Sequence, residues 1–136
     1  MAENKSRVLK AVKRIVPITA AAVLAAIIAL TVYIMICSAN GKVADVFGIS
    51  VLRVVSGSME PSISEGDYII VRKTDSGELK SGDIICFYSK DSKIYGMPNT
   101  HRIVSILPDG SFVTKGDANK TEDDTAVSAD MIIGRY

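Results

Sequence analysis

The chain is 136 residues long and 48% apolar, and its formal net charge is +1. This length predicts one small domain, and the apolar content excludes an intrinsically disordered chain. Two cysteines, Cys37 and Cys86, are too few for a disulfide-stapled scaffold or a cysteine-built zinc site. A single histidine, His101, likewise excludes a multi-histidine metal centre.

The charged residues are distributed unevenly along the chain. Residues 1–14 contain five basic side chains and one acidic side chain, whereas the rest contains 11 basic and 14 acidic side chains. Nucleic-acid binding needs a basic folded face, so no nucleic-acid partner is expected. A basic segment at the amino terminus is instead typical of membrane orientation.

Residues 15–37 form a run of 23 positions without a charged side chain. A helix of this length is ~35 Å long, which is enough to cross a hydrocarbon core of ~30 Å. Pro17 would fall in its first turn, where a helix tolerates proline. The basic residues 1–14 predict a cytoplasmic amino terminus, one membrane pass and an exoplasmic remainder. A cleaved signal peptide is the alternative, although its apolar core is usually only about 7–15 residues long.

The remainder predicts a linker over residues 38–46 and a β-rich domain over residues 47–136. Six short apolar segments are separated by turns rich in Gly, Ser, Asp and Pro. These segments are residues 46–55, 67–72, 83–88, 101–107, 111–115 and 131–134. Segments 67–72 and 83–88 are nearly all apolar, which predicts strands covered on both faces, with Cys86 in the core. The sequence therefore predicts an all-β domain of several short sheets with one N-terminal transmembrane helix.

The first chemical candidate is the segment SGSMEP, residues 56–61, which follows a predicted strand. A glycine between Ser56 and Ser58 lets the backbone turn sharply and expose a hydroxyl beside a free N–H. A serine nucleophile needs both features. The same composition is ordinary for a turn before proline, so the segment alone does not indicate catalysis.

Two further candidates are His101, at the start of a predicted strand, and the acidic loop over residues 115–124. A lone histidine is usually a surface residue and an acidic loop is usually a solvated turn. The loop also lacks the spacing of an EF-hand calcium site. A serine, the only histidine and a loop aspartate can nevertheless form a nucleophile, base and orienting acid.

Four sequence blocks resemble type I signal peptidase. They are SGSMEP (residues 56–61), EGDYIIVRK (65–73), HRIV (101–104) and TKGDAN (114–119). They are similar in particular to the branch of the endoplasmic reticulum, archaea and some sporulating bacteria, which has His where the common bacterial branch has a catalytic Lys. The resemblance covers the anchor and nearly all of residues 47–134. It implies the signal peptidase/LexA-like β-fold and no metal or organic cofactor.

The resemblance also implies roles for individual residues. Ser58 corresponds to the nucleophile and His101 to the general base. Asp123 corresponds to the third member of the triad, and the sequence leaves a one-residue ambiguity between Asp123 and Asp124.

Three supporting residues follow from the same resemblance. Ser56 is similar to the hydroxyl that joins the Ser58 amide in the oxyanion hole. Asp117 corresponds to a supporting carboxylate, and Arg102 to an arginine with a structural role. The chain ends at Tyr136, where family members usually continue, and this departure bears on the completeness of the last sheet.

The function implied is that of a membrane-anchored serine endopeptidase that cleaves N-terminal signal peptides from exported precursors after small residues. Precursor proteins and the lipid bilayer are the expected partners, and accessory membrane subunits are left open. The expected location is the cell membrane, or the endoplasmic reticulum membrane in a eukaryote. Two alternatives stay open: a self-cleaving repressor of the LexA kind, which uses Lys and has a DNA-binding domain absent here, and a non-catalytic membrane-tethered β-domain that acts as an adaptor.

Overall fold

The computed structural model describes residues 2–136, apart from the side chains of residues 2–9 and 11. The basic side chains of Lys5 and Arg7, which belong to the predicted cytoplasmic tail, lie outside the described residues. The chain divides into two units, Met1–Asn40 and Gly41–Tyr136. Each unit is described by itself below.

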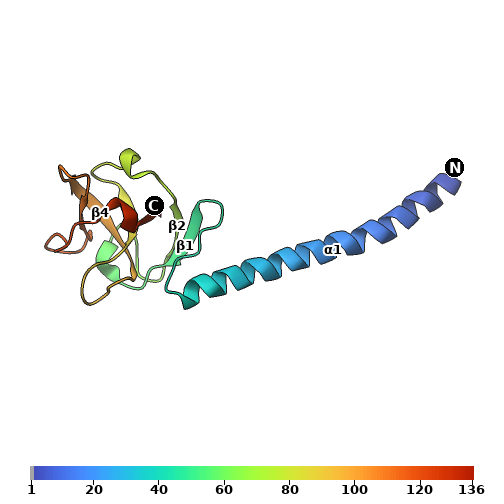
Figure 1. Ribbon diagram of the computed structural model, residues 1–136, viewed down its shortest axis with the longest axis horizontal. Coiled ribbons are helices and arrows are strands. Elements are labelled where there is room, and N and C mark those ends of the chain that lie inside the picture. The colour runs from blue at the N-terminus through green and yellow to red at the C-terminus, as the bar shows by residue number, and fades with distance from the viewer. Residues whose placement is uncertain (1) are drawn as a thin grey trace. The chain divides into compact units, whose positions relative to one another are not determined.

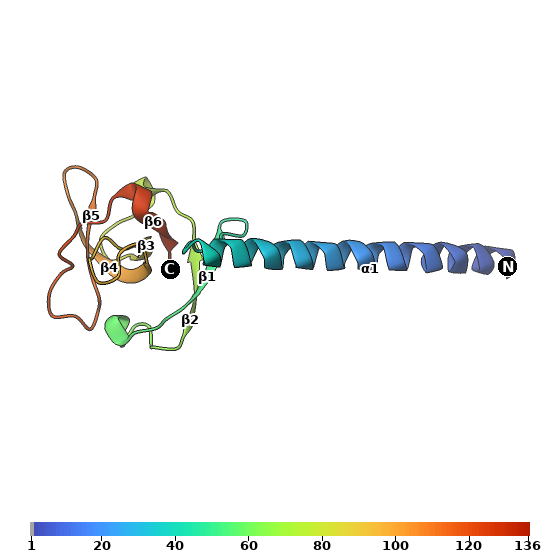
Figure 2. The ribbon, with the colours of Figure 1, turned by 60° about the horizontal axis from the view of Figure 1, so that its bottom comes forward.

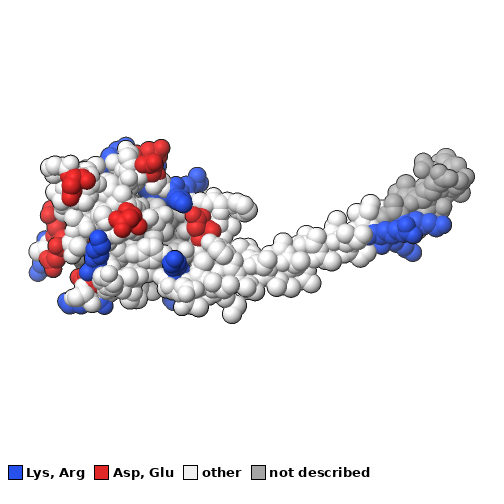
Figure 3. Space-filling model, in the orientation of Figure 1, with Lys and Arg blue, Asp and Glu red and all other residues white. Residues whose placement is uncertain are grey.

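The first unit is the helix α1 (Ala2–Ala39), which is drawn in blue in Figure 1. Its segment Val12–Ala39 is long and apolar enough to cross a membrane, and none of its most apolar window is buried inside the protein. Pro17 lies inside this helix and not in its first turn, because the helix begins well before the predicted start at residue 15. The visible face of α1 carries basic atoms only near its amino-terminal end (Figure 3).

Two threonine hydroxyls within the apolar part of α1 are satisfied locally. The Thr31 hydroxyl donates to the Ile27 carbonyl at 2.9 Å, and the Thr19 hydroxyl donates to the Val16 carbonyl at 2.9 Å. A hydrocarbon environment offers no other partner for such groups, so these bonds are compatible with a membrane span. At the end of the helix, the Asn40 side-chain amide donates to the Ile36 carbonyl at 2.7 Å.

The second unit is one antiparallel sheet of six strands, in the order β1-β2-β6-β3-β4-β5. Figure 2 shows this order across the unit. The strands are β1 (Ile49–Arg53), β2 (Tyr68–Arg72), β3 (Ile84–Tyr88), β4 (Pro98–Ile106), β5 (Phe112–Lys115) and β6 (Ile132–Arg135). The predicted all-β class with one N-terminal apolar helix is confirmed, and each predicted segment overlaps one strand. The several short sheets expected from the sequence are joined into one.

Strand β3 is covered on both faces, as the apolar run predicts. Its alternate residues enter two different hydrophobic clusters. Ile85 and Phe87 pack with Ile103 and other residues of one cluster, whereas Cys86, fully buried as predicted, packs with the second cluster around Met59. The sheet therefore has a core on each side of β3.

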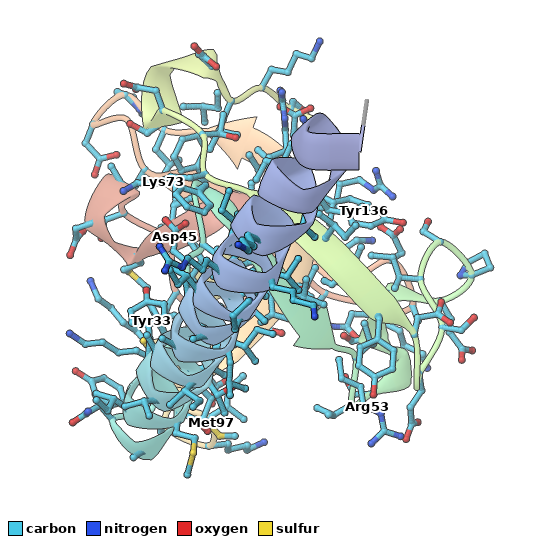
Figure 4. The ribbon with its side chains drawn as sticks, turned by 90° about the vertical axis from the view of Figure 1, so that its right-hand side faces the viewer. Tyr33, Asp45, Arg53, Lys73, Met97 and Tyr136 are labelled. Atoms are coloured by element: carbon cyan, nitrogen blue, oxygen red, sulfur yellow. The ribbon has the colours of Figure 1, made fainter. Side chains whose placement is uncertain are left out.

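The similar prediction for β2 is wrong. Its outward residues Tyr68 and Ile70 are 73% and 56% exposed. Ile70 pairs with Val51 of the edge strand β1, which is 63% exposed on the same face. An apolar run cannot distinguish a two-sided core from an apolar face that the described residues leave uncovered. Arg53 and Lys73 lie at opposite ends of this β1–β2 hairpin (Figure 4).

Strand β6 joins the two halves of the sheet at Gly134. Its ladder to β2 has a single registered pair, Arg72 with Arg135. A Cβ added at Gly134 would lie 2.6 Å from the Arg72 carbonyl carbon and closer still to its oxygen. The absence of a side chain at this position therefore lets the two backbones meet.

We expect Gly134→Ala to lower the free energy of unfolding by about 1–3 kcal/mol, because the β2 backbone must move away from the new methyl group. Gly77→Ala is the matched control, since a Cβ there would meet only the Asp75 side chain at 3.4 Å. Chemical unfolding of the full chain in detergent measures the difference. Equal midpoints for the two variants would show that the close approach at Gly134 does not limit stability.

Candidate active site

The Ser58 turn follows β1 in the chain, and its residue Met59 belongs to the second hydrophobic cluster. It forms the short 3-10 helix η1 (Gly57–Met59). Met59 is only 2% exposed, so its side chain anchors the turn in the core. The Ser58 carbonyl accepts a hydrogen bond from the Ala118 N–H at 2.9 Å. This combination fixes the serine backbone and leaves its side chain partly accessible.

His101 lies in β4 and its ring faces the Ser58 turn. It is 5% exposed, and the edge of its ring packs against Phe87, with the centroids 6.3 Å apart. Its Nε2 atom is 3.3 Å from Ser58 Oγ. The predicted nucleophile and base, which are 43 positions apart in sequence, are thus within hydrogen-bond reach.

Asp123 contacts the other ring nitrogen of His101. Its Oδ2 atom lies 2.6 Å from His101 Nδ1. Because a carboxylate only accepts, Nδ1 carries the proton in this contact and Nε2 is left to accept the Ser58 hydroxyl proton. Asp124 is exposed and has no such contact, so Asp123 is the acid that reaches the histidine.

Arg102, the next residue of β4, makes a separate ion pair. Its Nε donates to Asp117 Oδ1 at 2.8 Å and its Nη2 to Asp117 Oδ2 at 2.6 Å. Further bonds run from Nη1 to the Gly82 carbonyl and from Nη2 to Ser62 Oγ, at 2.9 and 3.2 Å. The hydrogen bond from Arg102 is the main cause that lowers the pKa of Asp117. Arg102 therefore holds three segments around β4.

Ser56 also reaches the predicted nucleophile. Its hydroxyl lies 3.4 Å from Ser58 Oγ and is solvent exposed. The backbone at Ser56 is extended, with φ −150° and ψ 156°, so the chain enters the turn as a strand would. Four of the six candidate site residues, Ser56, Ser58, His101 and Asp123, thus form one series of contacts, and the other two, Arg102 and Asp117, form the separate ion pair.

Two contributors were missed by the sequence analysis. Thr114 donates its hydroxyl to Asp123 Oδ2 at 2.6 Å. Its position on the buried face of β5 was the available signal, because a buried hydroxyl needs a partner. Gly116 was given no role of its own, yet a Cβ there would lie 2.6 Å from the Ser58 carbonyl oxygen.

The acidic loop was also considered as a cation site. Among the residues whose side chains are described, no three His, Cys, Asp or Glu side chains are grouped so that they could hold a metal ion. Two of the loop carboxylates are instead engaged by Arg102 and His101. Each of these two carboxylates is thus paired with one basic side chain.

A serine, a histidine and an aspartate in hydrogen-bonded series on a β-domain are the geometry of the serine hydrolase class. Comparison with known proteins narrows this class. Residues 8–113 match the family described as signal peptidase, peptidase S26. The chain belongs to this family.

Individual relatives agree with this assignment. The chain is 38% identical over 114 residues to signal peptidase I W of Bacillus subtilis, which covers 81% of the chain and 58% of that protein. It is 31% identical over 77 residues to the human signal peptidase complex catalytic subunit SEC11C, covering 54% and 38%. It is 36% identical to the SEC11 subunit of Chaetomium globosum, covering 54% and 43%. The chain thus spans about two to three fifths of these relatives, and no solved structure matches significantly.

The Arg102–Asp117 pair predicts an acid-dependent stability difference. Because the pKa of Asp117 is lowered on folding, its contribution is fully present above the ordinary aspartate range and is lost as the pH falls through the lowered value. We expect Asp117→Asn to lower the free energy of unfolding by about 1–3 kcal/mol at neutral pH. The difference from the unmodified chain should shrink in acid.

Unfolding curves at several pH values measure this effect, with Asp124→Asn as the control at an exposed position of the same loop. A deficit in Asp117→Asn that is the same at pH 7 and in strong acid would contradict the ion-pair explanation.

Proposed function

We propose that the chain is a signal peptidase in which Ser58 is the nucleophile, His101 the general base and Asp123 the orienting acid. The observation that carries the proposal is the contact series from Ser58 Oγ through both ring nitrogens of His101 to Asp123. The substrates would be exported precursors, cut after small residues. Membership of the signal peptidase family supports this choice of substrate class.

In the acylation step, Ser58 Oγ attacks the carbonyl carbon of the scissile peptide bond while His101 Nε2 takes the hydroxyl proton. The tetrahedral intermediate collapses by breaking the C–N bond. The imidazolium gives its proton to the leaving amine, which becomes the new amino terminus of the exported protein. The signal peptide remains as an ester on Ser58.

In the deacylation step, His101 Nε2 takes a proton from water, and the water oxygen attacks the ester carbon. Collapse of the second intermediate breaks the bond to Ser58 Oγ, which recovers its proton from the imidazolium. Asp123 lowers the energy of both imidazolium states because its negative charge is 2.6 Å from Nδ1. The reaction uses no cofactor.

The oxyanion would be stabilised by the Ser58 amide and the Ser56 hydroxyl. An extended substrate could pair with a free strand edge, a common mode of peptide recognition. Because the edge strand β1 leads into the turn that begins at Ser56, pairing with β1 would place the scissile carbonyl beside this turn. The exposed position of the Ser56 hydroxyl supports this role.

The apolar helix would hold the catalytic unit at a membrane surface, where precursors emerge. In this arrangement residues 1–14 lie in the cytoplasm, residues 15–37 span the bilayer, residues 38–46 link, and residues 47–136 form the exoplasmic peptidase domain. The basic residues before the span support this orientation. Accessory membrane subunits fit the similarity to the catalytic subunit of a signal peptidase complex.

Replacement of the nucleophile tests the chemistry. We expect Ser58→Ala to abolish cleavage of a precursor by the detergent-purified chain, because methyl cannot form the acyl ester. Ser64→Ala is the matched control, an exposed serine a few residues further along. Cleavage that survives in folded Ser58→Ala would overturn the mechanism. A chain that cleaves nothing in any form would favour the adaptor alternative.

Protease accessibility tests the orientation. In sealed vesicles of known sidedness, protease added to the exoplasmic face should digest the region after residue 38, whereas protease added to the cytoplasmic face should leave it intact. The positive charge of the amino-terminal segment is the physical reason. If exoplasmic protease left the Ser58 region intact, the topology would be the reverse of the proposed one. Ser58 would then have no access to exported substrates.

A further inference from the structure

Thr114 is a fully buried hydroxyl residue beside the proposed catalytic acid. It lies in β5, where it pairs with Ile103 of β4, two residues beyond His101. Its exposed fraction is 0%. A buried hydroxyl is stable only when it is hydrogen-bonded, so the identity of its partner indicates its role.

Two hydrogen-bonding groups of Thr114 hold Asp123. The Thr114 hydroxyl donates to Asp123 Oδ2 at 2.6 Å. The Thr114 carbonyl accepts from the Asp123 N–H at 2.8 Å. One residue thus fixes the backbone and the carboxylate of the proposed acid, and it does so from a regular strand and not from the loop.

The carboxylate oxygen that Thr114 binds is the one that faces the histidine. Asp123 Oδ2 lies 2.6 Å from both Thr114 Oγ1 and His101 Nδ1. A carboxylate has several acceptor directions, and a free loop aspartate could turn another one to the ring. Donation from the Thr114 hydroxyl to Oδ2 restricts this rotation.

We propose that Thr114 is a positioning residue of the active site, which orients the Asp123 carboxylate toward His101. This inference rests on the proposed function for its kinetic consequence, but its structural part does not need turnover. The Asp123 side chain is 23% exposed and borders a pocket of about 170 Å³. Water can therefore approach one side of the carboxylate, whereas Thr114 closes the other.

The surroundings of Asp123 include other charged groups that a Thr114 variant leaves in place. Lys90 and Asp91, from the loop after β3, line the same pocket, as does Asp124 from the acidic loop. His101 is the group in direct contact. Thr114→Val and Thr114→Ser both keep all of these charges. A difference between the two variants therefore reports on the hydroxyl.

The main experiment compares Thr114→Val with Thr114→Ser. Valine has nearly the same shape but no hydroxyl, whereas serine keeps the hydroxyl. We expect Thr114→Val to reduce kcat for precursor cleavage about ten-fold to hundred-fold with little change in KM, the effect of one lost hydrogen bond to a charged group. Thr114→Ser should recover most of the activity.

The single histidine gives a second readout that is independent of turnover. The chain contains one His, so the imidazole signals in an NMR spectrum of labelled protein belong to His101. We expect the Nδ1 proton signal to shift or broaden in Thr114→Val and to be retained in Thr114→Ser. Thr121→Val is the matched control, since Thr121 is an exposed residue of the same acidic loop.

The outcomes separate this inference from the proposed function. Unchanged kcat and Nδ1 signal in folded Thr114→Val would overturn the positioning role and leave the peptidase proposal intact. Equal losses in Thr114→Val and Thr114→Ser would also overturn it, because a packing defect would then explain both. If Ser58→Ala cleaves as well as the unmodified chain, the proposed function fails, and the NMR comparison still decides whether Thr114 orients Asp123.

Discussion

One backbone hydrogen bond holds the acidic loop against the Ser58 turn, and the rest of the site depends on it. The Ala118 N–H donates to the Ser58 carbonyl at 2.9 Å. The approach is so close that a side chain at Gly116 would lie 2.6 Å from the same carbonyl oxygen. Loop and turn are therefore held in register by main-chain atoms, which position side chains more rigidly than a contact between two flexible side chains.

The acidic loop places two of its carboxylates on two successive residues of β4. Successive residues of a strand point to opposite faces, so the His101 and Arg102 side chains leave β4 in opposite directions. Asp123 meets the first and Asp117 the second. The loop thus contacts the strand on both faces. Because only a few backbone residues separate the two carboxylates, a displacement of one would also displace the other.

The class of fold could be predicted because apolar segments and turns are local signals. Apolar segments between turns located the strands, and the resemblance of the SGSMEP and HRIV blocks to a known family proposed Ser58 and His101 as site residues. The joining of the sheets could not be predicted, since it depends on the contact of Gly134 with the Arg72 backbone, far away in sequence. The exposed face of β2 was missed for a similar reason, because burial is a property of neighbours. Thr114 was missed because its partner lies across a loop.

The chemistry of the two partners explains why the carboxylates are not interchangeable. An arginine does not lose its proton in this pH range, so the Arg102–Asp117 pair has the same charge throughout a catalytic cycle and can only hold structure. In the proposed mechanism His101 gains and loses a proton, so the interaction energy of Asp123 with His101 changes during the cycle. Only the second kind of pair can lower a barrier, since catalysis requires interactions that are stronger in the transition state. The Cys86 thiol does not compete with the proposed nucleophile Ser58 for the substrate. Burial raises the pKa of Cys86 to about 11 and keeps the thiol protonated.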